Sequence, residues 1–193
     1  MTRGSYHHGD LKAVILAQAA VLVAERGADG VSLRELARAA GVSHAAPAHH
    51  FTDRRGLFSA LAAQGWRMLA AALAESRPEF LDAALAYVQF AVEHPGHYEV
   101  MFDRSLVNPD DPELVAAEAA AGAELASGVG TLDDARAKED PQAAGLAAWS
   151  LVHGFAMLWL NDVIDTDTDA VETARRVARM LFTPGPVEPG GDE

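Results

Sequence analysis

The chain has 193 residues, of which 50% are hydrophobic and none is cysteine, and its formal net charge is −13. This length fits one domain or two small ones, and the lack of cysteine excludes disulfides, thiolate zinc sites and a cysteine nucleophile. The polar stretch 1–10 has no signal-peptide core, and no uninterrupted apolar run reaches the roughly 18 residues of a membrane span. Abundant alanine and few β-branched runs favour helices, so we expect an all-α, cytoplasmic protein without a membrane partner.

The charge is distributed unevenly along the chain. Residues 1–67 include 8 basic and 5 acidic residues and 5 of the 8 histidines, whereas residues 68–193 include 7 basic and 23 acidic residues. The formal charges of the two parts are therefore +3 and −16. A basic head can bind phosphates while an acidic body is repelled from a duplex. The pattern permits DNA binding, although an acidic composition also suits other soluble bacterial proteins.

Two helices are predicted in the first 40 residues. Asp10 can cap the first helix, whose apolar positions recur at helical spacing until Gly27 ends it. The second begins at Ser32 with the capping-box sequence SLRE, in which Ser32 and Glu35 can satisfy each other's backbone N–H groups. The apolar face of this second helix is formed by Leu33, Leu36, Ala37 and Ala40.

A third short helix follows a tight turn at Gly41. We expect Ser43 to cap it and Phe51 to lie near its end, with Pro47 tolerated because it is close to the first turn. Two short helices joined by a glycine-containing turn are typical of a helix-turn-helix. Periodicity alone leaves open a purely structural helical hairpin.

The predicted segments after residue 52 are helices over 53–76, 77–94, 96–106, 113–127, 142–164 and 171–181, a charged loop over 128–141 and a disordered tail over 183–193. We therefore expect two domains, 1–52 and 53–182. The helix that begins after the Asp53 cap is rich in apolar residues on several sides, so it is expected to pack on both domains.

The segments 6–12 (YHHGDLK), 32–37 (SLRELA), 41–47 (GVSHAAP) and 49–51 (HHF) resemble the DNA-binding region of TetR-family transcriptional regulators, and the resemblance extends from residue 6 to residue 58. It implies an all-α fold in which an N-terminal three-helix helix-turn-helix domain is joined through helix four to a helical bundle for ligand binding and dimerisation. Carried over by position, the resemblance assigns DNA contacts to Lys12, Ser32, Arg34, Ser43, His44, Ala45, His49, His50 and Arg54.

One position departs from the family pattern. Residue 48 is alanine, where the family usually has a tyrosine that hydrogen-bonds a DNA phosphate. Phosphate contacts position a protein on the duplex and base contacts specify the sequence, so Ala48 is expected to weaken or retune DNA binding without changing the fold.

The last two predicted helices indicate a dimer. The segment 142–164 is apolar on nearly all sides and has to be covered on all sides, whereas the last helix has one apolar face, with Val171, Ala174, Ala178 and Leu181 opposite three arginines. Paired with their copies in a second chain they would form a four-helix interface, and the resemblance implies a homodimer through these helices. Trp149, His153 and Gly154 also resemble the Trp-His-Gly signature of one C-terminal subgroup of the family.

Bulky residues in the body are candidates for the wall of an effector pocket, and we expect that wall to include Trp66, Tyr87, Phe90, Tyr98, Met101, Phe102, Trp149, His153 and Phe155. The alternative for each is an ordinary core position, and His153 can equally be a hydrogen-bonded core histidine. His94 and His97 are the best-spaced histidines but lack a third ligand, so no metal or cofactor is expected.

These patterns predict a homodimeric repressor that binds double-stranded operator DNA and is released by a small-molecule effector, with helix four as the lever between the two sites. Two alternatives remain. Ala48 leaves open a helical ligand- or protein-binding module with weakened or lost DNA binding. An enzyme using His153 and Asp162 as an acid–base pair is disfavoured because the sequence shows no catalytic constellation.

Overall fold

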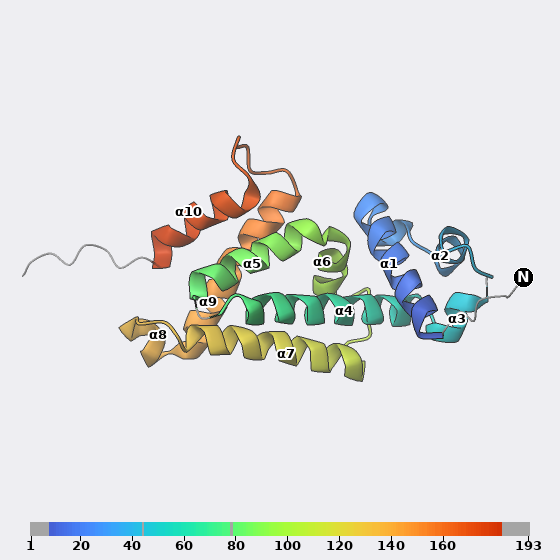
Figure 1. Ribbon diagram of the computed structural model, residues 1–193, viewed down its shortest axis with the longest axis horizontal. Coiled ribbons are helices and arrows are strands. Elements are labelled where there is room, and N and C mark those ends of the chain that lie inside the picture. Colours follow the sequence, from blue (N-terminus) through green and yellow to red (C-terminus); the bar gives the residue numbers. More distant parts are fainter. Residues whose placement is uncertain (1–7, 44, 78, 183–193) are drawn as a thin grey trace, which may run out of the picture.

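The computed structural model describes residues 8–43, 45–77 and 79–182, and the predicted tail over 183–193 lies outside them. The regular elements of these residues are all helical, as predicted. They are α1 (His8–Arg26), η1 (Ala28–Gly30), α2 (Leu33–Ala39), α3 (Ala46–His50), α4 (Arg54–Glu75), α5 (Phe80–Glu93), α6 (Pro95–Phe102), α7 (Pro112–Val129), α8 (Ala135–Glu139), α9 (Pro141–Leu160) and α10 (Ala170–Phe182). In Figure 1 the helices α1 to α3 form a head at one end, and α4 to α10 form the body.

Local side-chain chemistry defines the start of α2. The Glu35 backbone N–H donates to Ser32 Oγ at 3.3 Å, and the Ser32 backbone N–H donates to Glu35 Oε2 at 3.2 Å. This reciprocal pair is the predicted capping box. The turns before and after the helix contain Gly27 at φ 74° and Gly41 at φ 68°, a backbone region that is costly for residues with a Cβ atom.

Several predicted boundaries are wrong. The helix predicted over 77–94 begins at Phe80, and those predicted over 96–106 and 142–164 end at Phe102 and Leu160. The helix α1 begins at His8, so Asp10 lies inside its first turn. The helix α3 begins at Ala46, and its N-cap residue is Ala45, which provides no side-chain cap. Ser43 contributes its backbone carbonyl, which accepts a hydrogen bond from the Ala46 backbone N–H at 3.0 Å. The segment 128–141 contains the short helix α8, whose first turn is capped by Asp134, instead of being a loop throughout.

The body is built around α4, which lies alongside α7 and also packs against α5 and α6 (Figure 1). Its inward residues Leu61 and Leu69 are almost completely buried, as are Val88 on α5 and Leu114 on α7. The helix α9 packs against α5, and α10 packs against both α5 and α9. The side chain of Leu181, predicted on the apolar face of the last helix, lies outside the described part.

Among the residues that the structure describes, two helices, α4 and α9, each have an 18-residue stretch that is long and apolar enough to cross a membrane by length and composition. Half of the apolar stretch of α4 is buried inside the protein, which is typical of a core helix. Only 22% of the apolar stretch of α9 is buried in the single chain. The apolar surface of α9 therefore needs a separate explanation.

The helix α6 fastens the head to the body, and the loop after it holds the start of α4. Gly96 approaches α1 so closely that a Cβ atom there would lie 2.0 Å from the Ala20 carbonyl oxygen. Glu99 Oε1 accepts a hydrogen bond from the Ala28 backbone N–H at 2.7 Å, and the Arg55 guanidinium donates to the Val107 carbonyl. The joint between the two sites is therefore made by α6 as well as by α4.

A buried histidine lies in the contact between α6 and α4. His97 is 8% exposed, and its Nε2 is 3.2 Å from Gln64 Oε1. Burial, with a smaller contribution from neighbouring His94, lowers the pKa of His97 to about 4. The neutral imidazole can donate this hydrogen bond, whereas the protonated ring would have to be charged inside the core.

We expect the free energy of unfolding to fall as the pH is lowered from 7 to 4.5. The unfolded chain binds a proton at this histidine near pH 6.5 and the folded chain only near the lowered pKa of about 4, so acid favours unfolding by about 2 kcal/mol from this group. Urea titrations of the wild type and of His97→Gln, which cannot titrate there, measure the difference. Equal loss of stability in the two proteins over this pH range would contradict this role for His97.

Candidate functional site

The structure places most of the predicted DNA-binding residues at the surface of the head, on or next to α2 and α3. Their side chains are exposed at Ser32, Arg34, Ser43, Ala45 and His49. His50 is half-buried and its ring lies 6.3 Å from that of Phe51. His44 lies outside the described residues. Arg38 is a further exposed cation on α2 that the sequence argument did not include. These positions remain predicted DNA contacts.

Two of the predicted phosphate-binding cations have partners within the protein. Arg54 Nη2 donates to the Ala28 carbonyl at 2.7 Å and Arg54 Nε to the Val31 carbonyl at 3.2 Å, and the guanidinium lies 4.7 Å from the centre of the Phe58 ring. The structure thus gives Arg54 a structural role in the head, between η1 and α4. Lys12 Nζ lies 3.8 Å from a carboxylate oxygen of Glu113 at the start of α7.

The helix α3 has few side chains that can hydrogen-bond DNA. Pro47 is buried and occupies one of the first two helical positions, as predicted. Ala48 follows it and is exposed, so the position that usually supplies a tyrosine hydroxyl presents only a methyl group. The described residues of α3 that can hydrogen-bond DNA through their side chains are therefore His49 and His50.

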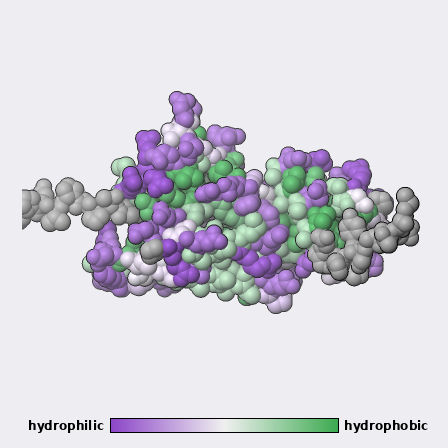
Figure 2. All heavy atoms as spheres, in the orientation of Figure 1, coloured by the Kyte–Doolittle hydropathy of each residue, from purple (hydrophilic) through white to green (hydrophobic). Residues whose placement is uncertain are grey.

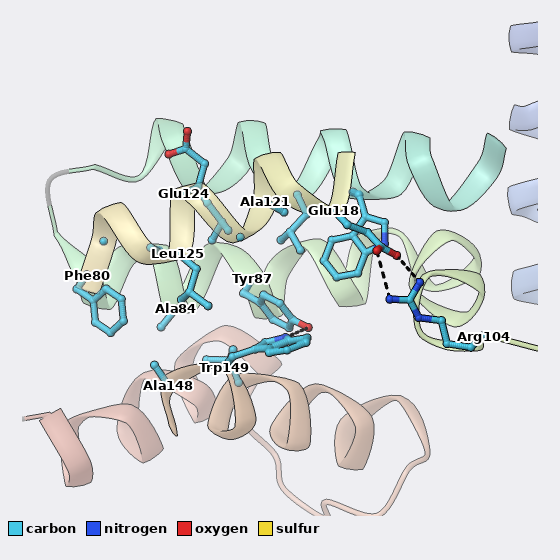
Figure 3. A pocket seen from close by; sticks show the side chains of 17 residues that line it. Phe80, Ala84, Tyr87, Arg104, Glu118, Ala121, Glu124, Leu125, Ala148 and Trp149 are labelled. Atoms are coloured by element: carbon cyan, nitrogen blue, oxygen red, sulfur yellow. Dashed lines mark hydrogen bonds and ion pairs between the residues drawn. The ribbon is translucent and has the colours of Figure 1, made fainter. Parts of the chain in front are cut away.

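The body contains a cavity of about 290 Å³ between α4, α5, α7 and α9 (Figure 3). Its wall is mostly apolar and is formed by Trp66, Leu69, Leu73, Phe80, Ala83, Ala84, Tyr87, Arg104, Glu118, Ala121, Gly122, Glu124, Leu125, Gly128, Ala148, Trp149 and Val152. A concave site lined by apolar and aromatic side chains with a few polar groups is typical of a small-molecule binding site.

Three of the nine predicted pocket residues line this cavity, namely Trp66, Tyr87 and Trp149. The other six, which are Phe90, Tyr98, Met101, Phe102, His153 and Phe155, do not appear in its wall. Most of these are core residues: Phe90, Tyr98, Met101 and Phe155 are each at most 7% exposed. Phe155 packs instead against the ring of Trp159, with ring centres 5.9 Å apart.

The wall that sequence reasoning missed belongs to α7. Glu118, Ala121, Gly122 and Leu125 all line the cavity and recur at the i, i+3, i+4 and i+7 spacing of one helix face. Two of these four have little or no side chain, so they leave space between α7 and the neighbouring helices. A search for aromatic residues could not find them, whereas a search for small residues on one face of a helix could.

A hydrogen-bond network of four side chains joins the cavity wall to α6. Trp149 Nε1 donates to the Tyr87 hydroxyl at 3.3 Å, and the hydroxyls of Tyr87 and Tyr98 lie 3.1 and 2.8 Å from His153 Nδ1. Tyr87 and Trp149 lie side by side in Figure 3, with the bond between them dashed. His153 thus lies beside the wall residues, one contact removed from the cavity.

Burial keeps this network neutral. It raises the pKa of Tyr87 to about 12, raises the pKa of Tyr98 far above its usual value and lowers the pKa of His153. In the tautomer that carries its proton on Nε2, neutral His153 accepts through Nδ1 from the closer hydroxyl, that of Tyr98. Asp162 follows the end of α9 and is exposed, and the hydrogen-bond partners that the structure shows for His153 are tyrosines. The geometry does not form the acid–base pair considered above.

One ion pair lies at an end of the cavity, and a second involves a wall residue of α7. At the end nearer the head, Arg104 donates to both carboxylate oxygens of Glu118, at 2.9 and 3.2 Å (Figure 3). The Glu124 carboxylate points away from the other labelled wall residues in Figure 3, and its Oε2 lies 2.8 Å from Nη2 of Arg77, which does not line the cavity. The charged groups of the wall are therefore already paired within the protein.

Large apolar side chains are exposed on α9 and α10 in the single chain. They are Leu146, Trp149, Met157 and Leu158 on α9 and Val177 and Met180 on α10, with exposed fractions from 36% to 82%. Figure 2 shows hydrophobic residues at the surface of the body among hydrophilic ones, in the region where α5, α9 and α10 lie in Figure 1. Such a concentration on two neighbouring helices marks an interaction surface.

The residues that the structure describes contain no group of three or more side chains placed to hold a metal ion. His94 and His97, the candidates considered from the sequence, have ring centres 5.9 Å apart, and His97 is engaged with Gln64.

Two family models match the chain. Residues 15–61 match the model described as bacterial regulatory proteins of the tetR family, and residues 80–181 match the model described as the tetracyclin repressor-like C-terminal domain. Together they cover the helix-turn-helix and most of the body. The second description does not specify the Trp-His-Gly subgroup.

Two HTH-type transcriptional regulators are similar in sequence. One is Rv0681 of Mycobacterium tuberculosis, 40% identical over 96 residues, which are 48% of this chain and 42% of that protein. The match thus spans less than half of that relative's length. The other is YobS of Bacillus subtilis, 26% identical over 166 residues, or 83% of this chain and 84% of that protein.

Solved structures share the fold over almost the whole chain. A protein of unknown function from Rhodococcus sp. RHA1 superimposes with a TM-score of 0.74 at 33% identity, covering 93% of this chain and 97% of that one. PfmR of Thermus thermophilus, a TetR-family regulator, gives 0.69 at 20% identity, with coverages of 91% and 96%. AibR, solved in complex with isovaleryl coenzyme A and operator DNA, gives 0.68 at 18% identity, with coverages of 91% and 100%.

The geometry and the comparisons agree on a helix-turn-helix head attached to an all-helical body. The C-terminal family model alone covers more than half of the chain, and the N-terminal model covers α2 and α3. The chain therefore belongs to the TetR family of bacterial transcriptional regulators, with a DNA-binding domain at its N-terminus.

Proposed function

We propose that this protein is a cytoplasmic, homodimeric repressor whose operator binding is relieved by a small molecule in the cavity between α4, α5, α7 and α9. The observation that carries the proposal is the apolar cavity itself, which adjoins the network leading to α6. AibR, which shares the fold, was solved with both a ligand and operator DNA. The Trp-His-Gly assignment, based on Trp149, His153 and Gly154, is a finer part of the same proposal.

The proposed dimer accounts for the exposed apolar residues of α9 and α10. Two copies related by a twofold axis would bury these faces against each other in a four-helix arrangement, with the same patch used on both sides. Two recognition helices could then enter successive major grooves about 34–36 Å apart and bind a pseudo-palindromic operator. A dimer interface also explains why α9 is apolar on sides that the single chain leaves open.

The contacts described above supply a physical route from the cavity to the head. A ligand that separates Tyr87 from Trp149 would disturb the bonds of His153 to the two tyrosines. Tyr98 belongs to α6, and the next residue, Glu99, holds the Ala28 backbone N–H of the head. A displaced α6 would therefore change the position of the head, and an effector preferring that arrangement would weaken operator binding. The lever in this proposal is α6 together with α4.

The decisive experiment titrates the full-length protein, verified as a dimer, onto its own promoter DNA and onto a random duplex of equal length at one fixed salt concentration. Repressor function requires a clear preference for the promoter, because non-specific binding depends only on phosphate charge. Equal affinity for both duplexes would contradict the proposal. It would instead favour a ligand- or protein-binding module without specific DNA recognition. Ala48, which lacks the usual tyrosine hydroxyl, is consistent with that alternative.

Restoring the usual tyrosine tests the effect of position 48. We expect Ala48→Tyr to raise affinity for promoter DNA about fivefold, roughly 1 kcal/mol, because the new hydroxyl can donate a hydrogen bond to a phosphate. Fluorescence anisotropy with labelled promoter measures the change. Ala48→Phe adds the same ring without the hydroxyl and should give less than half of the gain in binding free energy. An unchanged affinity in Ala48→Tyr would show that position 48 does not contact the backbone.

A further inference from the structure

The chemistry of the cavity wall defines the class of ligand that fits it. We infer that the cavity binds uncharged, largely apolar molecules with at most one hydrogen-bonding group. This inference rests on the proposed effector role for its connection to DNA, but the binding itself can be tested separately. It follows from three features of the wall: most of its polar groups are hydrogen-bonded, its charged groups are paired, and small residues create its space.

Most of the polar groups inside the wall are already engaged. The Tyr87 hydroxyl lies within hydrogen-bond distance of Trp149 Nε1 and of His153 Nδ1. Two wall atoms differ, because Trp66 Nε1 and Glu124 Oε2 are buried and have no hydrogen-bond partner among the described residues, although Glu124 Oε2 lies 2.8 Å from Arg77 Nη2. A single neutral acceptor on the ligand could satisfy the Trp66 donor. Additional polar groups on the ligand would lose their hydration without gaining a partner.

The charged groups of the wall disfavour a ligand of either charge. Arg104 and Glu118 are paired with each other at one end, and Glu124 is paired with Arg77 outside the cavity. An anion near the first pair would meet the Glu118 carboxylate, and a cation would meet the Arg104 guanidinium, unless that ion pair opened. Entry of a charged group into an apolar cavity also requires that it give up its hydration. The wall is thus complementary to a neutral molecule.

The small residues of α7 and its neighbours give the cavity its space. Ala83 and Ala84 on α5, Ala121 and Gly122 on α7 and Ala148 on α9 all line it. Gly122 is itself exposed, and a Cβ atom built there would have no atom within 4 Å, so a larger side chain is free to fit at this position of the wall. The lining residues extend from Arg104 to Phe80 (Figure 3), so we expect the cavity to take an elongated apolar molecule.

Three probes with the same ten-carbon chain separate charge from size: 1-decanol, decanoate and decylammonium. We expect calorimetric titration of the full-length dimer at pH 7 to give a Kd for 1-decanol at least ten times lower than for either charged probe. Tighter or equal binding of decanoate or decylammonium would overturn the inference. Failure of 1-decanol to bind would overturn it as well.

A matched pair of variants places the binding in the cavity. Gly122→Leu adds a large side chain to a position of the cavity wall, and it favours the helical state because leucine has a higher helix propensity than glycine. It should weaken 1-decanol binding at least tenfold. Ala123→Leu adds a side chain at the next position of α7, which is exposed and does not line the cavity, and should leave binding unchanged. Equal binding to both variants would contradict the assignment of the site.

Promoter release provides the separate test of the proposed function. If 1-decanol binds the wild type, fails to bind Gly122→Leu and does not affect the promoter complex, the ligand class stands and the effector role fails. If the protein does not bind its promoter specifically, the binding measurements still decide the ligand class. The two proposals can therefore fail independently.

Discussion

Leu158→Glu is expected to convert the proposed dimer into monomers and to abolish tight operator binding. Leu158 lies near the end of α9 and is 48% exposed in the single chain, within the apolar surface that we assign to the dimer interface. In a twofold interface one substitution introduces two carboxylates. Each would be removed from water without a partner, at a cost of several kcal/mol per charge.

The expected rise in the dimer dissociation constant is at least about 100-fold, which corresponds to about 2.7 kcal/mol. Operator affinity should fall with it, because each monomer carries one recognition helix and loses the contribution of the second half-site. Analytical ultracentrifugation over a range of protein concentrations measures the first effect, and binding to the promoter measures the second.

Val115→Glu is the matched control for this substitution. Val115 has the same 48% exposure but lies on α7, outside α9 and α10. It should leave the oligomeric state unchanged, which would separate the effect of location from that of adding a surface charge. A Leu158→Glu protein that remains a dimer at the concentrations where the wild type is dimeric would place the interface elsewhere.

Arg54→Met is expected to destabilise the DNA-binding head by about 2–4 kcal/mol. The methionine keeps an apolar stem but removes the donors that hold the carbonyls of Ala28 and Val31. Ala28 and Val31 are each 3% exposed, so water cannot readily replace these donors. Hydrogen bonds from a charged group contribute roughly 1.5–3 kcal/mol, and the interaction of the cation with the Phe58 ring adds about 0.5–1 kcal/mol.

Urea unfolding at a fixed protein concentration measures this loss, and hydrogen exchange shows whether it is confined to α1 to α3. Arg34→Met is the control, because Arg34 is exposed and has no hydrogen bond or ion pair within the described part of the chain. It should change stability by less than about 0.5 kcal/mol while weakening DNA binding. The reverse pattern, a stable Arg54→Met head with weaker and less salt-dependent DNA binding, would support the phosphate contact predicted from the family resemblance.

Much of the head could be predicted because its defining features are local. The capping box joins Ser32 and Glu35, three residues apart, and the turn at Gly41 needs only a residue that tolerates positive φ. The family resemblance over the same segment added the function of these helices. The predicted cap at Ser43 failed because the helix begins at Ala46 with Ala45 as its N-cap residue, so Ser43 lies two residues before the capping position.

The body was less predictable because its site depends on distances between helices. The aromatic residues suggested correctly that a cavity lies near Trp66, Tyr87 and Trp149. They also suggested Phe90 and Met101, which fill the core, because a large apolar side chain looks the same in a sequence whether it borders a void or fills one. The α7 wall was missed for the complementary reason, since Ala121 and Gly122 contribute by the volume that they leave empty.

Local sequence patterns and the packing of the helices determine different features of this protein. Hydrophobic spacing, caps and glycine turns act over a few residues, so the order of residues alone is enough to specify an all-helical chain with a helix-turn-helix at its start. Packing is needed to bring Arg54 to carbonyls 23 and 26 residues away, and His153 to a tyrosine 55 residues away on α6. Those contacts depend on which helix faces lie against each other. They decided that Arg54 supports the head and that His153 lies between the cavity wall and the joint to the head.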